Sequence, residues 1–347
     1  VMLIMSTYAW FSANREVALT GITATVKAAE GLQISLDGTT WKSSVVVTQS
    51  ALSTLGTSVN NYVWPSELIP VSADGSINGN DARFVYGDIN SEGNILNGVV
   101  NAPASDGRYI SFDLYFKNSS SQSAGDKLQL NTTSYVQIHS LATGEDATLL
   151  DGKTGTGLEN CVRAGILLYG GSQTFTASTA NIRAIPITDT NDNTKTGKFA
   201  VWEPFYAAHI GEVVTNDGRV SDGSTGYPTY AILAAAIGKN LKGVNVASTT
   251  CSLVDNTGAD IADSTGTYMT TLSTLTSDAG TVSSITDMRA VDGTTQLMLY
   301  QNSIMKARVY IWLEGQDPDC NDTASTGKAF DIQLGFIKPQ VNAGGGS

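Results

Sequence analysis

The sequence predicts an all-β fold: an antiparallel β-sandwich or jelly roll that carries long loop insertions and one short helix. Three segments, 109–117, 308–315 and 330–336, alternate apolar and polar side chains with the period of two that is typical of half-buried strands. Residues 128–138 and 161–169 show a similar pattern. The chain also contains 35 glycines, and Asp-Gly and Asn-Gly pairs recur between its apolar segments, as expected for many tight turns.

The remaining elements are less regular. Residues 17–28 are rich in Val, Ile and Thr, which favour a strand. Residues 32–36 alternate cleanly and run into Asp37-Gly38, a pair that indicates a β-hairpin. Residues 45–55 fit a strand and a short helix equally well, so the sequence leaves both open. The best helical candidate is the stretch 230–242.

We expect one folded unit, residues 17–340, because no repeat of fixed period and no clear linker divides the chain. Two turn-rich stretches, about 56–108 and 170–300, are interpreted as insertions into this unit. Residues 1–16 are interpreted as a separate apolar strand followed by a hinge, and residues 341–347 as a flexible tail.

Composition excludes some classes of protein. A net charge of -12 without a basic patch argues against nucleic acid as a partner. No stretch reaches the roughly 20 apolar residues that a membrane-spanning helix needs. A charged fraction of only 15%, with abundant Gly, Ser, Thr and Asn, favours a secreted protein, extracellular or at the cell surface. Asn118-Ser-Ser120 is one of three triplets that match the glycosylation pattern, although this composition produces such matches by chance.

One segment resembles part of a calcium-binding loop. Asp88, Asn90 and Glu92 supply oxygen ligands at its first, third and fifth positions, and Gly93 follows at the sixth. The bidentate glutamate required at the twelfth position is replaced by Val99. Calcium is therefore the one cofactor to consider, and an Asx-turn is the simpler interpretation of the same residues.

Three cysteines allow at most one disulfide within the chain. Cys161 and Cys320 are the favoured pair because both lie at ends of strong predicted strands, and Cys251 is the other candidate partner for Cys320. Three unpaired thiols remain the alternative. No Cys-x-x-Cys pair is present, which argues against a zinc ribbon or a redox motif.

Enzymatic activity is not expected. Glu203 and His209 could form an acid–base pair, but a glycosidase needs a second carboxylate across a cleft, and the sequence places none. No nucleophile elbow, zinc-protease motif or phosphate loop occurs.

The first residues of the sequence form an apolar strip. As a strand, this strip is apolar on both of its faces at the start, so it should be buried on both sides, as when a strand completes another molecule's sandwich. It could instead be the remnant of a secretion signal or the first strand of its own sandwich. The expected inserted side chains are Val1, Met2, Leu3, Ile4, Met5, Tyr8, Trp10 and Phe11, and the expected hinge is Ser12, Ala13, Asn14, Arg15 and Glu16.

Three stretches carry a resemblance to a known family. The run Thr7-Tyr-Ala-Trp-Phe-Ser12, with a polar hinge and a Thr/Val-rich strand after it, resembles the start of the TasA/camelysin type of secreted Firmicutes protein. Residues 31–41 and 310–320 are similar to elements of uncharacterised secreted proteins from related bacteria. The resemblance implies a jelly roll that assembles into an extracellular fibre or pilus through its N-terminal strand.

The sequence thus favours a non-enzymatic structural subunit of an extracellular filament, a pilus or biofilm matrix fibre, which polymerises head-to-tail with copies of itself. Donor-strand exchange between subunits would connect the copies. The alternative is a surface-layer or adhesive protein that binds glycans through exposed aromatic side chains such as Trp41, Tyr62 and Trp64.

Overall fold

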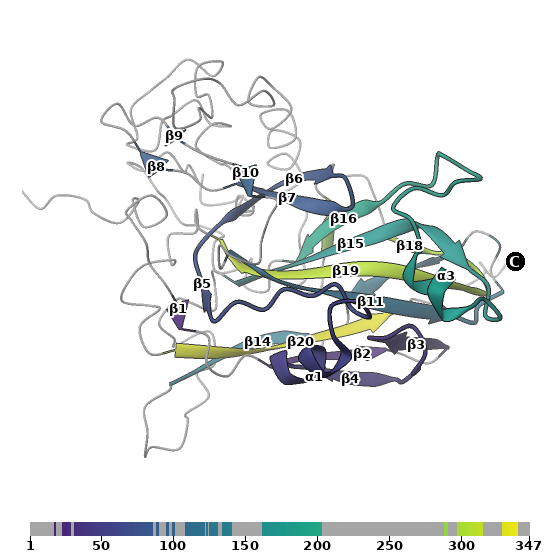
Figure 1. Cartoon of the computed structure of the whole chain (residues 1–347), viewed down its shortest axis with the longest axis horizontal. Coiled ribbons are helices and arrows are strands. Elements are labelled where there is room, and N and C mark those ends of the chain that lie inside the picture. The colour runs from purple at the N-terminus through teal and green to yellow at the C-terminus, as the bar shows by residue number, and fades with distance from the viewer. Residues whose placement is uncertain are drawn as a thin grey trace, which may run out of the picture.

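Two packed β-sheets form the body of the protein, which confirms the predicted sandwich (Figure 1). This description comes from a computed structural model. The residues that it describes are 17–18, 23–28, 31–85, 88–89, 95–96, 99–100, 108–121, 123, 125–130, 134–140, 162–202, 288–290, 297–314 and 328–338.

The larger sheet has six strands, and every neighbouring pair in it is antiparallel. Its middle strand, β19, pairs with β11 on one side and with β15 on the other, so that Asp113 and Leu167 flank Arg308. In order across the sheet the strands are β17 (Met288–Ala290), β16 (Lys198–Trp202), β15 (Val162–Gln173), β19 (Ser303–Leu313), β11 (Ile110–Asn118) and β3 (Leu32–Ser35).

The smaller sheet joins early and late parts of the sequence. Strands β2 and β20 pair in parallel, with Val26 opposite Leu334, whereas the other pairs in this sheet are antiparallel. Strand β4 pairs with β2 and forms one edge, and β13 and β14 both pair with the far side of β20. The strands are β4 (Ser44–Val47), β2 (Thr23–Ala28), β20 (Lys328–Ile337), β14 (Tyr135–Ser140) and β13 (Gln129–Leu130).

The core lies between the two sheets and is built from alternate residues of their strands. Ile110, Phe112, Leu114 and Phe116 of β11 are fully buried in it, as the alternation predicts. The ring of Phe116 meets that of Phe336 on β20 edge to face, with 5.1 Å between the centroids. Such contacts exclude water from the space between the sheets, which is the main source of stability in a sandwich.

The outer face of the larger sheet is also buried, contrary to the prediction that 109–117 is half-buried. Tyr109, Ser111, Asp113 and Tyr115 are all buried there. The reason is a second layer formed by β6 (Ser72–Asn78), β7 (Asp81–Val85) and β10 (Val99–Val100), which lies over this face. Phe84 of β7 stacks on Tyr109 at 4.3 Å and meets Trp312 edge to face at 5.2 Å.

The expected hairpin at Asp37-Gly38 is reduced to one bridge. The turn is present: Gly38 has a φ of 73°, and the Asp37 carboxylate accepts hydrogen bonds from the backbone N–H groups of Thr39 and Thr40, both at 2.7 Å. The strands on its two sides, however, separate into different sheets, and only Ile34 and Lys42 pair between them. The chain therefore crosses from the larger to the smaller sheet here.

Residues 45–55, for which the sequence left a strand and a short helix open, contain both. The strand β4 is followed directly by α1 (Gln49–Leu55), whose N-cap Thr48 accepts a hydrogen bond from Ala51 N at 3.1 Å. Leu52 of this helix is buried in the core.

The other described elements are short. The predicted strand 17–28 appears as β1 and β2, and 128–138 contains β13 and most of β14. The helical candidate 230–242 and the tail 341–347 lie outside the described residues. The elements not yet given are β1 (Val17–Ala18), β5 (Glu67–Leu68), β8 (Asp88–Ile89), β9 (Ile95–Leu96), β12 (Asp126–Lys127), β18 (Met298–Leu299) and α3 (Thr179–Arg183).

Candidate functional site

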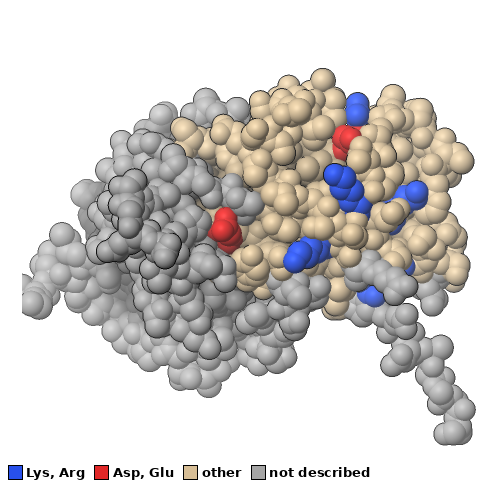
Figure 2. All heavy atoms as spheres, turned by 90° about the horizontal axis from the view of Figure 1, so that it is seen from below, with Lys and Arg blue, Asp and Glu red and all other residues tan. Residues whose placement is uncertain are grey.

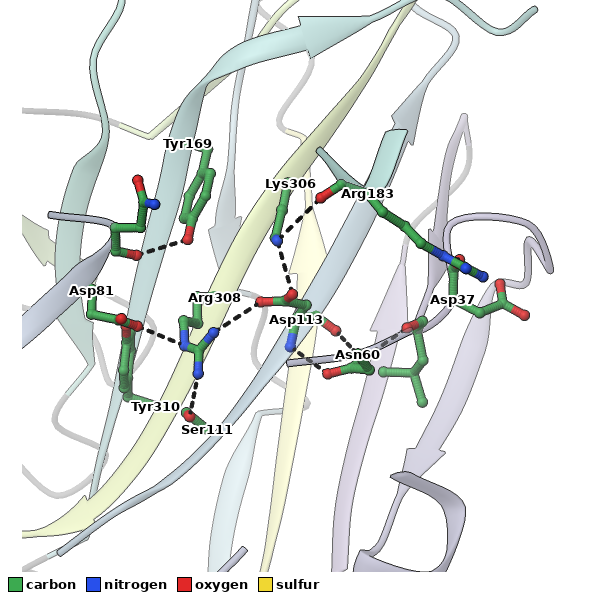
Figure 3. A network of polar contacts seen from close by, with 12 residues as sticks. Asp37, Asn60, Asp81, Ser111, Asp113, Tyr169, Arg183, Lys306, Arg308 and Tyr310 are labelled. Atoms are coloured by element: carbon green, nitrogen blue, oxygen red, sulfur yellow. Dashed lines mark hydrogen bonds and ion pairs between the residues drawn. The ribbon is translucent and has the colours of Figure 1, made fainter. Parts of the chain in front are cut away.

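A cluster of charged and polar side chains lies on the outer face of the larger sheet, under its covering layer (Figure 3). Asp113 from β11 and Arg308 from β19 form its centre, and their side chains are only 2% and 4% exposed. Two charges this deeply buried are costly unless each is paired and hydrogen-bonded. The first question about this site is therefore whether its charges are satisfied.

Each central charge has two partners of opposite sign. The Asp113 carboxylate lies 2.8 Å from Lys306 Nζ and 3.5 Å from Arg308 Nη1. Arg308 Nε lies 2.9 Å from Asp81 Oδ1 on the covering strand β7, and Arg308 Nη2 donates a hydrogen bond to Ser111 Oγ at 3.1 Å. Two carboxylates and two cations thus balance one another, and the cluster joins β7 to the sheet below it.

Asn60 completes the edge of β11 beside this cluster. Its Oδ1 accepts from the Asp113 N–H at 2.9 Å, and its Nδ2 donates to the Asp113 carbonyl at 2.8 Å and to the Leu36 carbonyl at 2.8 Å. Strand β3 pairs with β11 only from Tyr115 onward, so this amide takes the place of a neighbouring strand at Asp113. Asn60 is fully buried, and its side chain satisfies three backbone groups.

Tyrosine hydroxyls connect the cluster to the covering layer. Tyr310 donates to Asp81 Oδ1 at 2.9 Å and accepts from Ala82 N at 3.0 Å, while Tyr169 donates to the Asn80 carbonyl at 2.7 Å. Burial raises the pKa of Tyr310 well above its ordinary value, and burial together with the nearby Asp113 charge raises the pKa of Tyr169. These hydroxyls therefore stay protonated and act as donors.

The opposite end of the cluster connects to α3 and the turn at Asp37. Lys306 Nζ lies 3.5 Å from the Arg183 carbonyl, and Arg183 Nε donates to the Asp37 carbonyl at 2.9 Å. Partial burial would raise the pKa of Asp37, but hydrogen bonds from Thr40, Thr39 and Ser35 hold it well below its ordinary value. The Asp37 carboxylate is therefore ionised at neutral pH and can accept these hydrogen bonds.

The geometry of this cluster fits a structural role, in which it holds the covering strand β7 to the sheet. Asp113 is paired with Lys306 and Arg308, and Arg308 is paired with Asp81 as well. Tyr310 accepts a hydrogen bond from the Ala82 N–H and donates one to the Asp81 carboxylate. A general acid or base must reach a proton on a substrate, and the two central groups are almost wholly covered. Among the described residues, no three His, Cys, Asp or Glu side chains are grouped so as to hold a metal ion.

A second feature is the edge strand β4. It pairs with β2 on one side, and no other described strand pairs with it on the other. Val45 and Val47 are buried in the core, whereas Ser44 and Val46 face outward, and Val46 is 55% exposed. An edge of this kind offers free backbone groups to an incoming strand.

The residues predicted for donor-strand exchange, 1–16, lie outside the described residues. The same is true of Cys161, Cys320, Glu203 and His209, so the predicted disulfide and the acid–base pair stay predictions.

Of the three residues predicted as calcium ligands, only Asp88 lies among the described residues. Asp88 belongs to the short strand β8, where its backbone is opposite Leu96 of β9. Asn90 and Glu92 lie outside the described residues. The calcium site therefore also stays a prediction.

The aromatic residues proposed for glycan binding are less exposed than expected. Tyr62 and Trp64 are half-buried and pack against the core. Trp41 is half-buried as well, and the ammonium group of Lys117 lies 5.7 Å from its ring centroid and 5.0 Å from that of Phe175. The rings of Tyr62 and Trp64 thus pack in part against the core, which leaves less of their surface for carbohydrate binding.

The glycosylation triplet at Asn118 is not usable in the folded protein. Asn118 is fully buried, and its Nδ2 donates to Asp126 Oδ2 at 2.7 Å and to the Tyr300 carbonyl at 3.1 Å. An acceptor asparagine must instead present its amide at the surface.

Comparison with known proteins gives no relative from which a function could be transferred. No protein-family model matches the chain, and no curated protein and no solved structure matches it either. Within the described part of the chain, no helix combines the length and the apolar character needed to cross a membrane.

Asn60→Ala should lower the free energy of unfolding by at least about 2 kcal/mol. The substitution leaves buried backbone groups of Asp113 and Leu36 without a partner, at about 1–3 kcal/mol for each group. Asn61→Ala, at the exposed neighbouring position, is the matched control and should change the free energy by less than about 0.5 kcal/mol. Urea unfolding measures both, and equal effects would contradict the role given to Asn60.

Stability should fall as the pH rises above about 10, the ordinary pKa of tyrosine. Burial raises the pKa of Tyr115, Tyr169 and Tyr310, so the folded state holds these protons more tightly than the unfolded state. Their contribution is complete below the unfolded pKa and is lost as the pH rises towards the folded pKa. Ultraviolet absorbance should show these tyrosines ionising only together with loss of the circular dichroism signal. Ionisation of all 13 tyrosines in one step near pH 10 in a folded protein would refute this.

Proposed function

We propose that this protein is a non-enzymatic structural subunit of an extracellular filament. In this proposal residues 1–11, called the donor strand, leave their own subunit and add to the sandwich of a neighbouring copy. The observation that carries the proposal is a sandwich whose edge strand β4, rich in valine, pairs with no described strand on its outer side, in a chain that also begins with a strand-like apolar segment.

The alternation of the donor strand supports strand addition. One of its faces carries Met2, Ile4, Ser6, Tyr8 and Trp10, and the other carries Leu3, Met5, Thr7, Ala9 and Phe11, so both faces are mainly apolar. Main-chain hydrogen bonds to an open edge would give affinity, and alternate side chains would enter the core of the neighbour or cover its surface. A short polar stretch, Ser12 to Glu16, follows and suits an exposed connection between subunits.

Burial of the donor strand's apolar side chains can supply enough free energy for two copies to associate. Complete burial of a large apolar side chain contributes about 1.5–3 kcal/mol. The donor strand offers several such side chains, and their sum can exceed the cost of association, which is about 4–15 kcal/mol. Because the donor and its acceptor are different surfaces, the contact is head-to-tail and does not close by itself, which leads to a filament.

The described site is consistent with a structural role. Its buried charges hold the covering layer to the sheet and have their partners within the protein. The proposal also agrees with what the resemblance to the TasA/camelysin type of protein implies.

Removal of residues 1–11 should abolish filament formation and leave a folded monomer, because in the proposal these residues pack in a neighbouring copy and not in their own sandwich. Electron microscopy measures the filaments, and analytical ultracentrifugation with circular dichroism checks the monomer. Removal of the tail 341–347 is the control and should leave assembly unchanged. Filaments formed by the protein that lacks residues 1–11 would disprove the proposal.

A further inference from the structure

We infer that the acceptor for the donor strand is the outer edge of β4 in a second copy of this chain. The inference rests on the proposed function and adds the surface and the register at which two copies meet. It is carried by the hydrogen-bond pattern of β4, by the side chains that flank it and by the character of the surrounding surface.

The backbone of β4 presents free groups at two defined residues. Ala28 N donates to Ser43 O at 2.8 Å, and the register continues with Val26 opposite Val45 and Ala24 opposite Val47. Hydrogen-bonded and non-hydrogen-bonded pairs alternate along an antiparallel ladder. Val45 and Val47 therefore bond to β2.

Ser44 and Val46 consequently point their N–H and C=O groups away from β2. No hydrogen bond within the described part of the chain reaches these groups from the outer side. They form the start of a ladder that an additional strand could continue.

The strand β4 itself lacks two of the features that normally prevent strand addition. Native edges are protected by charged residues, proline, bulges or a covering loop. The sequence Ser-Val-Val-Val of β4 contains neither proline nor charge. Just before β4, on the same outer side, Lys42 is bonded to Ile34 of β3, so the free part of this edge begins at Ser44. The edge strand β17, by comparison, contains Arg289.

The side chains of β4 match a donor that is apolar on both faces. On the inner face, Val45 and Val47 are buried, so a strand added beside them would extend the core with one of its faces. On the outer face, the exposed Val46 offers an apolar neighbour to the opposite face of the donor. A strand with only one apolar face would leave Val46 in contact with water or polar groups.

Most of the described surface on the side of the molecule where β4 lies belongs to uncharged residues. Strand β4 lies at the lower margin of the described part of the molecule in Figure 1, and Figure 2 shows the molecule from that side. Charged side chains on the described part of this face are scattered, and more of them are Lys or Arg than Asp or Glu. The donor strand, which has no charged side chain, fits such a surface.

Val46→Pro in the full chain tests the inference. Proline removes the outward N–H that an added strand would need, whereas the β2–β4 ladder uses no N–H at this position. The critical concentration for filament formation, measured by sedimentation and electron microscopy, should rise at least tenfold. Val46→Thr keeps the N–H and the β-branched shape, and it is the matched control that should assemble nearly as the parent does.

Val46→Lys is a second variant that keeps every backbone group and places a charge on the edge. It should also reduce assembly at least tenfold, with a melting temperature close to that of the parent. If removal of residues 1–11 abolishes filaments while Val46→Pro and Val46→Lys both assemble normally, the donor role stands and β4 is not the acceptor. If residues 2–11 of the dilute monomer are protected from hydrogen exchange and Val46→Pro removes this protection, the occupant is the chain's own strand, which overturns the assignment to a second copy.

Discussion

The layered structure depends on the contact between Asp113 and Arg308 across β11 and β19. These residues are 195 positions apart in the sequence and are directly opposite in the middle of the larger sheet. Through Asp81 and Ser111 the same guanidinium holds β7, and through Lys306 the same carboxylate reaches α3. Removal of either residue would leave a buried charge with one partner fewer, and the loss of a partner from a buried ion pair typically costs about 3–5 kcal/mol. The contact therefore stabilises the covering layer.

This covering layer produces an asymmetry between the two sheets. The larger sheet is buried on one face by the core and on the other by β6, β7 and the polar cluster. The smaller sheet has an outer face with exposed positions, such as Lys27 and Val46, and it ends at β4. Strand addition is therefore expected at the smaller sheet, where Ser44 and Val46 of β4 carry no charge and pair with no described strand on their outer side.

The sequence predicted the positions of the strands better than the burial of their side chains. Alternation located β11, β19 and β20 because each faces the core with every second residue. The same alternation placed Asp113 and Arg308 on a solvent-facing side, since a polar side chain that meets an opposite charge from a distant strand has the same local pattern as one that meets water. Asp37-Gly38 correctly predicted a turn. It did not produce the expected hairpin, because the strand before the turn, β3, pairs with β11 and the strand after it, β4, pairs with β2. The run of valines in β4 left strand and helix open, and only the sheet order shows that β4 is an edge.

The most direct measurement is amide hydrogen exchange at β4, compared between monomer and filament. In the monomer, Val45 and Val47 should exchange slowly because they bond to β2, whereas Ser44 and Val46 should exchange rapidly. In the filament, Ser44 and Val46 should become protected by at least about tenfold while Val45 and Val47 stay protected. Rapid exchange at Ser44 and Val46 in fully assembled filaments would contradict assembly by strand addition at this edge.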